Sequence, residues 1–347
     1  MMLALACLAF LFCVVLAAAG MPGVSLGPRA TLGGARKGAR AAQPSDQAWV
    51  TLVMRGDAFV PGALVLAHSL RRVKTTRALV CMVTPDVSPD ARRSLAELFD
   101  RVREVPYIEA PTAPLPTEKQ RKLYPWISQA YTKWNCLGLT EWRRVIFVDA
   151  DMCFVENADE LFRLPAPAGC FCSAWLDAES PYLRWWRRRH AGAAELPHGA
   201  VLPPELLLEA LESPTFTAIA ALVVLDTDAQ AAGRFRAFLA ENAPYGARHR
   251  VRGSGADETS IVEFTARAGR AWRHVHPRYE AIPRKAGWGA GAGPIKAWHF
   301  HGGDKPWAVA PGTWPDLAAW WAEAERARVA RPALARWLAP PAKPAQG

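Results

Sequence analysis

Apolar runs alternate with amphipathic segments over residues 48–148. Three runs are nearly all apolar, which is typical of strands buried on both faces of a sheet, and a fourth strand candidate is more polar: 48–53, 78–84, 144–148 and 102–106. The segments between them have apolar residues at helical spacing: 60–73, 88–100 and 129–139. This alternation predicts an α/β fold with a mostly parallel, Rossmann-like sheet and helices on both faces.

The second half of the chain repeats these signals with one interruption. Residues 175–213 are rich in Trp and Arg and are interpreted as a largely helical insertion. Strand and helix patterns resume afterwards: strands at 216–226, 271–277 and 295–302, helices at 228–241, 253–269 and 314–328. We expect one domain over 48–310 that contains the insertion, followed by a C-terminal helix and tail over 311–347.

The N-terminal residues 3–19 are apolar without a break and end in small residues, with no Lys or Arg before Arg29. We interpret 1–19 as a signal peptide or signal anchor, and the Gly-, Ala-, Pro- and Arg-rich residues 20–47 as a flexible stem or propeptide. This predicts a protein of the secretory pathway, located in the Golgi or ER lumen or secreted. If residues 3–19 are not cleaved, they would anchor the protein in the membrane. A cytoplasmic enzyme is the alternative.

The composition limits the classes of binding partner and the roles of the cysteines that we expect. The net charge of +10 favours anionic partners, but no zinc finger, RNP-type motif or recognition helix is present, so nucleic acid is not expected. Of the seven Cys, Cys81 and Cys153 lie in apolar runs and are expected to be buried. The pair in 170–172 is too close together for a zinc site, and no disulfide pairing can be assigned.

The 15 Trp residues have two interpretations. They fill the core, or some of them stack on sugar rings in an acceptor groove near Trp185 and Trp186. The basic segment 184–190 is either a solvated helix face or a site for an anionic acceptor or lipid head group.

Two phosphate-binding motifs are missing. No G-x-G-x-x-G follows the first predicted strand, and no G-x-x-x-x-G-K-[ST] occurs in the chain. A nucleotide bound by this α/β fold would therefore not have its diphosphate held by a glycine-rich loop.

Asp149 and Asp151 follow directly after the apolar run 144–148. Ligands of open α/β sheets bind beyond the carboxyl ends of strands, and residues two apart in an extended segment point the same way. Two converging carboxylates repel each other unless a cation neutralises them. Mn²⁺ or Mg²⁺ is a suitable cation, because these ions prefer oxygen ligands. The alternative is a solvated turn. Asp159 and Glu160, further on, are expected to begin a structural turn.

The segment 299–307, HFHGGDKPW, supplies complementary groups. His299 is a suitable third ligand for a transition-metal ion, Gly302 and Gly303 allow backbone amides to approach an anion, and Lys305 can neutralise a phosphate. The alternative is a turn with a solvated lysine.

At four segments the chain resembles the glycogenin-like family 8 glycosyltransferases: 50–88, 131–162, 255–264 and 299–307. The segments occur in the family's order. The resemblance implies a single nucleotide-diphospho-sugar transferase domain of the GT-A type and a metal-dependent enzyme that retains the configuration of the sugar.

The resemblance also implies residue roles. Mn²⁺ (or Mg²⁺) would be held by Asp149, Asp151 and His299. The UDP part of a UDP-sugar would contact Leu52, Phe59, Ala150, Gly302 and Lys305. The residues near the transferred sugar would be Lys133, Asp257 and Glu258.

Three segments depart from the family pattern. Ile219, Ala220 and Ala221 occupy the place of its Asn-Ser/Ala-Gly, the loop with Arg55 and Gly56 is one residue longer than in glycogenin, and 175–213 does not match glycogenin. Self-glucosylation is not carried over, because no acceptor tyrosine can be assigned; Tyr279 is only a nearby candidate.

The predicted function is transfer of a hexose from a UDP-sugar to a hydroxyl of a carbohydrate, protein or lipid acceptor. A non-catalytic UDP-sugar-binding protein of the same fold is the first alternative, and a nucleotidyltransferase ranks third because its glycine-rich phosphate loop is absent. The oligomeric state is left open, with a dimer as one option.

Overall fold

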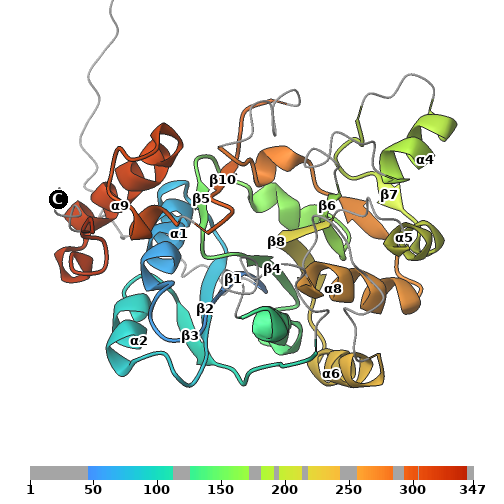
Figure 1. Ribbon diagram of the computed structural model, residues 1–347, viewed down its shortest axis with the longest axis horizontal. Helices are drawn as coiled ribbons and strands as arrows, with labels where there is room; N and C mark the ends of the chain where they lie inside the picture. Colours follow the sequence, from blue (N-terminus) through green and yellow to red (C-terminus); the bar gives the residue numbers. More distant parts are fainter. Residues whose placement is uncertain are drawn as a thin grey trace, which may run out of the picture. The chain divides into compact units, whose positions relative to one another are not determined.

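An eight-stranded sheet in the order β3-β2-β1-β4-β8-β6-β9-β7 forms the centre of the computed structural model (Figure 1). Beside it lies a two-stranded sheet of β5 and β10. The structure describes residues 46–111, 126–171, 181–190, 195–212, 218–242, 256–283, 293–303 and 305–341. The predicted signal peptide and nearly all of the predicted stem lie outside these residues.

The strands of the large sheet are β1 (Gln47–Val53), β2 (Ala78–Val83), β3 (Arg101–Glu104), β4 (Arg144–Val148), β6 (Ala168–Phe171), β7 (Val201–Leu202), β8 (Ala218–Asp226) and β9 (Trp272–His274). The pairs β1–β2, β1–β4, β2–β3 and β6–β9 are parallel, whereas β4–β8, β6–β8 and β7–β9 are antiparallel. The prediction of a mostly parallel sheet is confirmed, and the antiparallel pairs all involve β7 or β8.

Helices cover both faces of the sheet. One face packs against α1 (Val60–Arg72), α2 (Pro89–Ala96) and α9 (Ala318–Ala330). The other packs against the 3₁₀ helix η1 (Ile127–Gly138), α5 (Pro204–Leu211), α6 (Ala231–Glu241) and α8 (Ala256–Arg267). In β1, Trp49 and Val53 belong to the first apolar cluster and Ala48 and Val50 to the second, because successive strand residues point to opposite faces.

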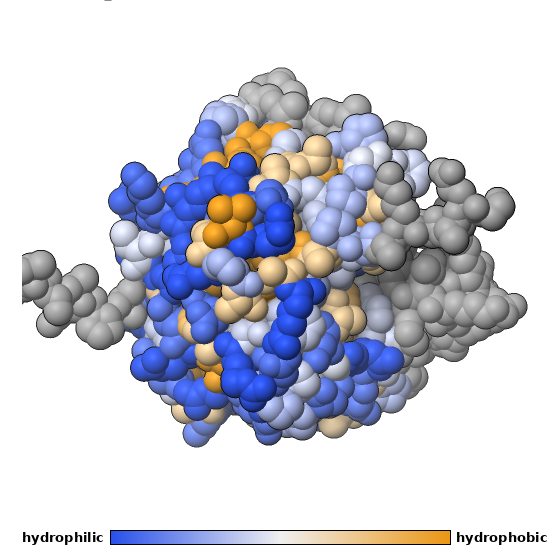
Figure 2. All heavy atoms as spheres, turned by 90° about the vertical axis from the view of Figure 1, so that its left-hand side faces the viewer, coloured by the Kyte–Doolittle hydropathy of each residue, from blue (hydrophilic) through white to orange (hydrophobic). Residues whose placement is uncertain are grey.

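The remaining short elements are α4 (Pro181–Arg189), β5 (Met152–Phe154), β10 (Ala297–His299) and the 3₁₀ turns Asp159–Arg163, Pro277–Tyr279, Pro306–Ala308, Pro315–Leu317 and Pro332–Leu334. Helices α2 and α9 lie at the left in Figure 1, and Figure 2 views the molecule from that side. The coloured part of that face is largely hydrophilic, with hydrophobic groups scattered over it in small areas.

The predicted elements differ from the structure in three places. Of the predicted helix 129–139, residues 129–138 belong to a 3₁₀ helix rather than an α-helix, and Leu139 is its C-cap. The described part of 175–213 contains the strand β7 as well as α4 and α5, and β7 pairs with β9 in the large sheet. Strands β5 and β6 were not predicted, because their short apolar runs acquire strand geometry only by pairing with distant segments.

Two structural expectations are confirmed. Cys81 and Cys153 are buried free thiols. Asp159 begins a 3₁₀ turn and accepts hydrogen bonds from Thr75 Oγ1 (2.6 Å), the Thr76 N–H (2.9 Å) and Trp49 Nε1 (3.2 Å). This carboxylate therefore fixes the turn after α1 to the strand β1.

Among the described residues, the helices are all too short or too polar to cross a membrane. Residues 3–19 are not among them, so the signal peptide or anchor, the secretory location and the cytoplasmic alternative stay predictions.

Replacing Asp159 by Ala removes the acceptor shared by Trp49, Thr75 and Thr76. We expect the free energy of unfolding to fall by about 1–3 kcal/mol, because the donors in this half-buried turn lose their partner. Urea denaturation followed by Trp fluorescence measures the change. Glu325→Ala, which removes a pair on the exposed surface of α9 (Glu325–Arg328, 2.7 Å), is the control and should leave the midpoint unchanged. Equal midpoints for both variants would contradict the assignment.

Candidate active site

The Asp149–Asp151 turn lies at the carboxyl end of β4, where the chain order of the parallel strands reverses. From β1 the chain proceeds to β2 and β3 on one side, and then to β4 on the other side of β1. In open α/β sheets this reversal opens a crevice beyond the strand ends, and ligands bind there. Gly62 of α1 approaches the same turn, since a Cβ added to it would lie 2.6 Å from the Ala150 carbonyl oxygen.

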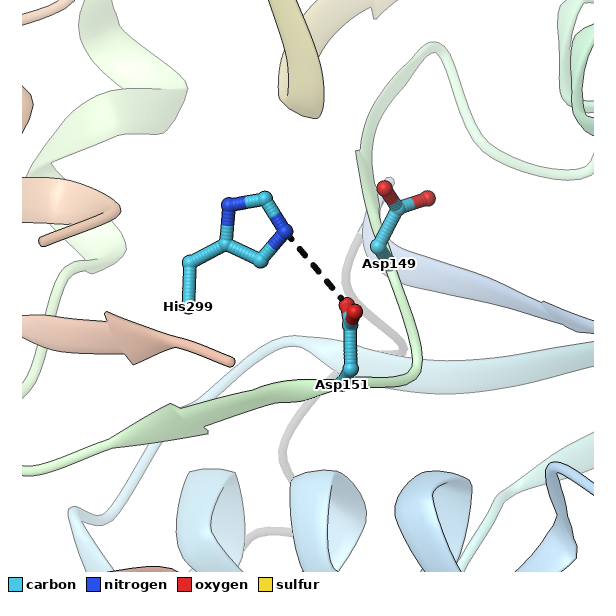
Figure 3. A group of neighbouring side chains, drawn as sticks. All are labelled: Asp149, Asp151 and His299. Carbon is cyan, nitrogen blue, oxygen red and sulfur yellow. Dashed lines mark ion pairs between the residues drawn. The ribbon is translucent and has the colours of Figure 1, made fainter. Parts of the chain in front are cut away.

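Pairing of β5 with β10 brings His299 to the two aspartates. His299 lies opposite Met152 in this antiparallel ladder, and the Phe300 N–H donates to the Asp151 carbonyl oxygen at 3.0 Å. One ligand atom each from Asp149, Asp151 and His299 lies within 4.8 Å of the others. Figure 3 shows the imidazole directed at Asp151, with His299 Nε2 3.6 Å from Asp151 Oδ1.

Each aspartate of the turn is paired with a lysine. Lys133 Nζ, from η1, lies 3.0 Å from Asp149 Oδ1 and 2.7 Å from Asp257 Oδ2. Lys305 Nζ pairs with Asp151 Oδ2. The structure therefore brings five of the predicted residues together around the turn, although they come from four different segments.

The two carboxylates have opposite pKa shifts. Burial raises the pKa of Asp149, and the repulsion from Asp151 and Asp257 adds to this, while Lys133 opposes it. Burial also acts to raise the pKa of Asp151, but the attraction of Lys305 and His299 outweighs it and the pKa is lowered. Asp151 is therefore the more persistent anion of the two.

Lys133 and His299 have the protonation states that the site needs. Burial acts to lower the pKa of Lys133, but Asp149, Asp257 and Glu258 raise it above the ordinary value, so the lysine stays cationic. Burial lowers the pKa of His299 to about 4. Its imidazole is therefore neutral near pH 7, as a metal ligand must be.

The residues fit a divalent metal ion. Asp151 Oδ1 and His299 Nδ1 are buried atoms without a hydrogen-bond partner among the described residues, which is costly unless another ligand uses the group. Two carboxylates and one imidazole make a mixed oxygen and nitrogen donor set, which suits Mn²⁺ and also accommodates Mg²⁺. Asp149, Asp151 and His299 would hold the ion.

Asp257 and Glu258 lie in the first turn of α8. Asp257 is buried and bound to Lys133, and its carbonyl oxygen accepts from Trp134 Nε1 at 3.2 Å. Glu258 is half-buried and close enough to Lys133 to raise its pKa. Both residues thus lie on the Lys133 side of the turn, away from the His299 side.

Four further residues predicted for UDP lie on different segments. Ala150 is buried within the turn, and Gly302 adopts φ +111°, a left-handed conformation that favours glycine. Phe59 packs edge-on against Trp307, at 5.5 Å between ring centroids. Leu52 packs in the second apolar cluster, whereas Phe59 packs against the first.

The side chains of β8 depart from the family pattern, but its backbone still contacts Asp149 and Lys133. The Asp149 N–H donates to the Ala221 carbonyl oxygen at 2.8 Å, and Lys133 Nζ lies 3.5 Å from the Ala220 carbonyl oxygen. Ile219, Ala220 and Ala221 all have buried, apolar side chains. The strand therefore positions Asp149 and Lys133 but adds no polar side chain at these three positions.

The longer loop after β1 is held by a network that the sequence did not reveal. Arg55 has φ +61°, which is unusual for a residue with a side chain. Its N–H donates to the Tyr107 hydroxyl at 3.0 Å, and the Gly56 N–H donates to Asp86 Oδ2 at 2.9 Å. Tyr107 in turn donates to Asp86 (2.9 Å), so the loop is fixed beside the crevice.

Gly62 and Glu280 are two further residues that sequence reasoning missed. A Cβ on Gly62 would also lie 2.6 Å from the Trp307 ring, so only glycine allows α1, the turn and Trp307 to pack together. Glu280 is fully buried; burial raises its pKa strongly, and Asp149 adds to the shift. A Pro-Gly pair at 61–62 by itself indicates only the start of a helix, and no periodicity in the sequence marks Glu280.

The structure has an α/β fold with helices on both faces of the sheet and an Asp-x-Asp turn at the end of β4. The model of the family described as "Glycosyl transferase family 8" matches residues 51–196. This segment contains Lys133, Asp149 and Asp151. Over this segment the chain is similar to glycosyl transferase family 8 and to glycogenins.

Among curated relatives, Glycogenin-1 of Homo sapiens is 39% identical over 118 residues, which is 34% of this chain and 33% of that protein. Glycogenin-1 of Caenorhabditis elegans is 36% identical over 133 residues, covering 38% and 30%. Galactinol synthase 1 of Arabidopsis thaliana is 33% identical over 135 residues, covering 38% of each. The matches thus span about a third of these relatives. A solved structure of an LgtC active-site mutant has a TM-score of 0.49 at 13% identity, covering 80% of this chain and 95% of that chain.

Replacing Gly62 by Ala tests the close packing of α1 on the turn. We expect a loss of about 1–3 kcal/mol in the free energy of unfolding, because the added methyl group meets a backbone oxygen and an indole ring. Thermal unfolding measures it. The control is Gly233→Ala in α6, where the new Cβ meets nothing within 4 Å and alanine favours the helix. A Gly62 variant as stable as the Gly233 variant would contradict the packing.

Proposed function

We propose that this protein is a metal-dependent glycosyltransferase that moves a hexose from a UDP-sugar to an acceptor hydroxyl with retention of configuration. The observation that carries this proposal is the convergence of Asp149, Asp151 and His299 at the carboxyl end of β4, flanked by Lys133 and Lys305. This set offers a metal site and two cations where a diphosphate needs them. The match of residues 51–196 to the model of glycosyl transferase family 8 supports the same chemistry.

The chemical difficulty is the departure of UDP from the sugar. The bond between the anomeric carbon and the phosphate oxygen breaks, and its electron pair stays on the diphosphate. The bound metal ion would supply positive charge that stabilises this leaving group. Lys305 would contact the phosphates and Lys133 would add positive charge beside the sugar, and both side chains are less than one fifth exposed, which strengthens such interactions.

Retention requires that the acceptor oxygen bond the anomeric carbon from the face that UDP leaves. A phosphate oxygen of UDP would take the proton of the acceptor hydroxyl. Asp257 would orient sugar hydroxyls rather than attack, because its carboxylate is already bound to Lys133 at 2.7 Å, which lowers its nucleophilicity. Glu258 would lie beside it on the sugar side. Leu52, Phe59, Ala150 and Gly302 would contact the rest of UDP.

One observation favours the second candidate function, a UDP-sugar-binding protein without turnover. Ile219, Ala220 and Ala221 offer no side-chain hydrogen bond to a sugar. The backbone contacts of Ala220 and Ala221 to Lys133 and Asp149 support the catalytic candidate, because they keep the charged groups in place. The acceptor stays a hydroxyl of a carbohydrate, protein or lipid.

UDP release with Mn²⁺ from UDP-glucose, UDP-galactose, UDP-GlcNAc, UDP-xylose and UDP-glucuronate, without acceptor, tests the function and identifies the donor. Replacing Asp149 by Asn should lower the rate about 100-fold or more, because a metal ligand is lost while the shape is kept. Asp46→Asn is the matched control, since Asp46 pairs with Arg143 at the opposite end of the same strand.

The outcomes separate the candidates. UDP release that persists in Asp149→Asn would overturn the metal site. UDP and Mn²⁺ binding without release from any donor would favour the binding protein. Pyrophosphate release from UTP would indicate a nucleotidyltransferase.

When the pH is lowered, the affinity for the metal ion should begin to fall at a higher pH than it would at a site of aspartates with ordinary pKa values. Asp149 must lose its proton to bind the ion, and its pKa is raised, so affinity is full at neutral pH and declines as the pH falls toward that raised value. His299 stays neutral throughout this range, because its pKa is about 4. Mn²⁺ titrations between about pH 7.5 and about pH 5 measure the decline. Constant affinity over this range would contradict the shift.

A further inference from the structure

Asp151 requires a counter-charge inside the protein. Its side chain is only 8% exposed, and an isolated buried carboxylate would be strongly destabilising. Oδ2 is paired with Lys305, and Oδ1 faces His299 at 3.6 Å. Among the described residues, Lys305 is the one lysine or arginine that forms an ion pair with Asp151.

The two lysines at the turn are anchored very differently. Lys133 binds both Asp149 and Asp257, points at the Ala220 carbonyl oxygen, and has its Nζ 5.2 Å from the ring centroid of Phe147. Its partners lie on three different elements, so it is held in place whether or not one of them changes.

Within the described part of the chain, Lys305 has one carboxylate partner, Asp151, and a long contact of 3.4 Å to the Phe300 carbonyl oxygen. Its side chain is 19% exposed, against 11% for Lys133. It follows Gly302, which has a left-handed φ of +111°, and precedes the turn Pro306–Ala308. Among the described residues, leaving Asp151 would therefore cost Lys305 only this one long backbone contact.

A metal ion at this site must share Asp151 with Lys305. An ammonium group and a divalent cation on one carboxylate repel each other, and this repulsion is strong where water is largely excluded. A diphosphate bound to the same ion would give Lys305 another anionic partner. Release of Lys305 from Asp151 then removes the repulsion, so the metal and the nucleotide assist each other in binding.

We propose that Lys305 is an exchangeable counter-ion: it neutralises Asp151 until a metal ion and a nucleoside diphosphate bind together, and then pairs with the diphosphate. Free Mn²⁺ binds weakly because Lys305 competes with it, and UDP turns this competitor into a ligand. The proposal rests on the proposed function and adds to it a coupling between the metal ion and the nucleotide.

Replacing Lys305 by Met tests the exchange through Mn²⁺ binding alone, measured by calorimetry or by the EPR signal of free Mn²⁺. Without nucleotide, the variant should bind Mn²⁺ about 5-fold tighter or more than the wild type, because the competing cation is gone. With Mn²⁺ present, it should bind UDP about 10-fold more weakly, because a phosphate contact is lost. UDP should therefore raise Mn²⁺ affinity much less in the variant than in the wild type.

Lys296→Met is the matched control. Lys296 is 17% exposed, lies near His299 in sequence, and pairs with Glu156 at 3.3 Å and Glu160 at 3.4 Å instead of with the turn. This variant should bind Mn²⁺ as the wild type does. Lys305→Arg keeps the charge and should also leave Mn²⁺ affinity low. If Lys305→Met does not fold, Lys305→Gln provides the same comparison.

The experiment distinguishes failure of the Lys305 exchange from failure of the proposed function. If the wild type binds UDP with Mn²⁺ but Lys305→Met binds Mn²⁺ alone no tighter than the wild type, the exchange is overturned and the proposed function stands. If the wild type does not bind UDP with Mn²⁺ at all, the proposed function itself fails.

Discussion

The pairing of β5 with β10 is the constraint on which the site depends. It joins the strand that leaves the Asp149–Asp151 turn to a segment near the C-terminal end of the described chain. This ladder, together with the bond from the Phe300 N–H to the Asp151 carbonyl oxygen, places His299 beside the two carboxylates and Lys305 against Asp151. Without it, two aspartates would remain at a strand end with no third ligand.

The charged side chains around the turn stabilise one another, so the charge state of each depends on the others. Asp149, Asp151 and Asp257 repel each other, and Lys133 and Lys305 hold them together. The same attractions give the two neighbouring aspartates opposite pKa shifts. Five charged groups in a poorly hydrated space are stable only as a set, and such a set favours a partner that brings both a cation and an anion.

Close packing fixes the position of the turn. Gly62 leaves no room for a side chain between α1, Ala150 and Trp307, and Trp307 also contacts Phe59. On the other side, the Ala221 carbonyl oxygen holds the Asp149 N–H. The turn is thus held by backbone and packing contacts that are independent of its own carboxylates, which leaves the carboxylates available for ligands.

The sequence alone determined the strands β1, β2 and β4, the helices α1 and α8, and the candidate residues Asp149, Asp151, His299 and Lys305, because these signals are local: periodicity, a cap, and short motifs. Tertiary structure alone decided that Lys133 bridges Asp149 and Asp257, that α1 requires glycine at position 62, and that β7 joins the large sheet. The physical reason is that ion pairs, steric contacts and strand pairing between distant segments depend on how the chain folds back, which no local pattern of residues encodes.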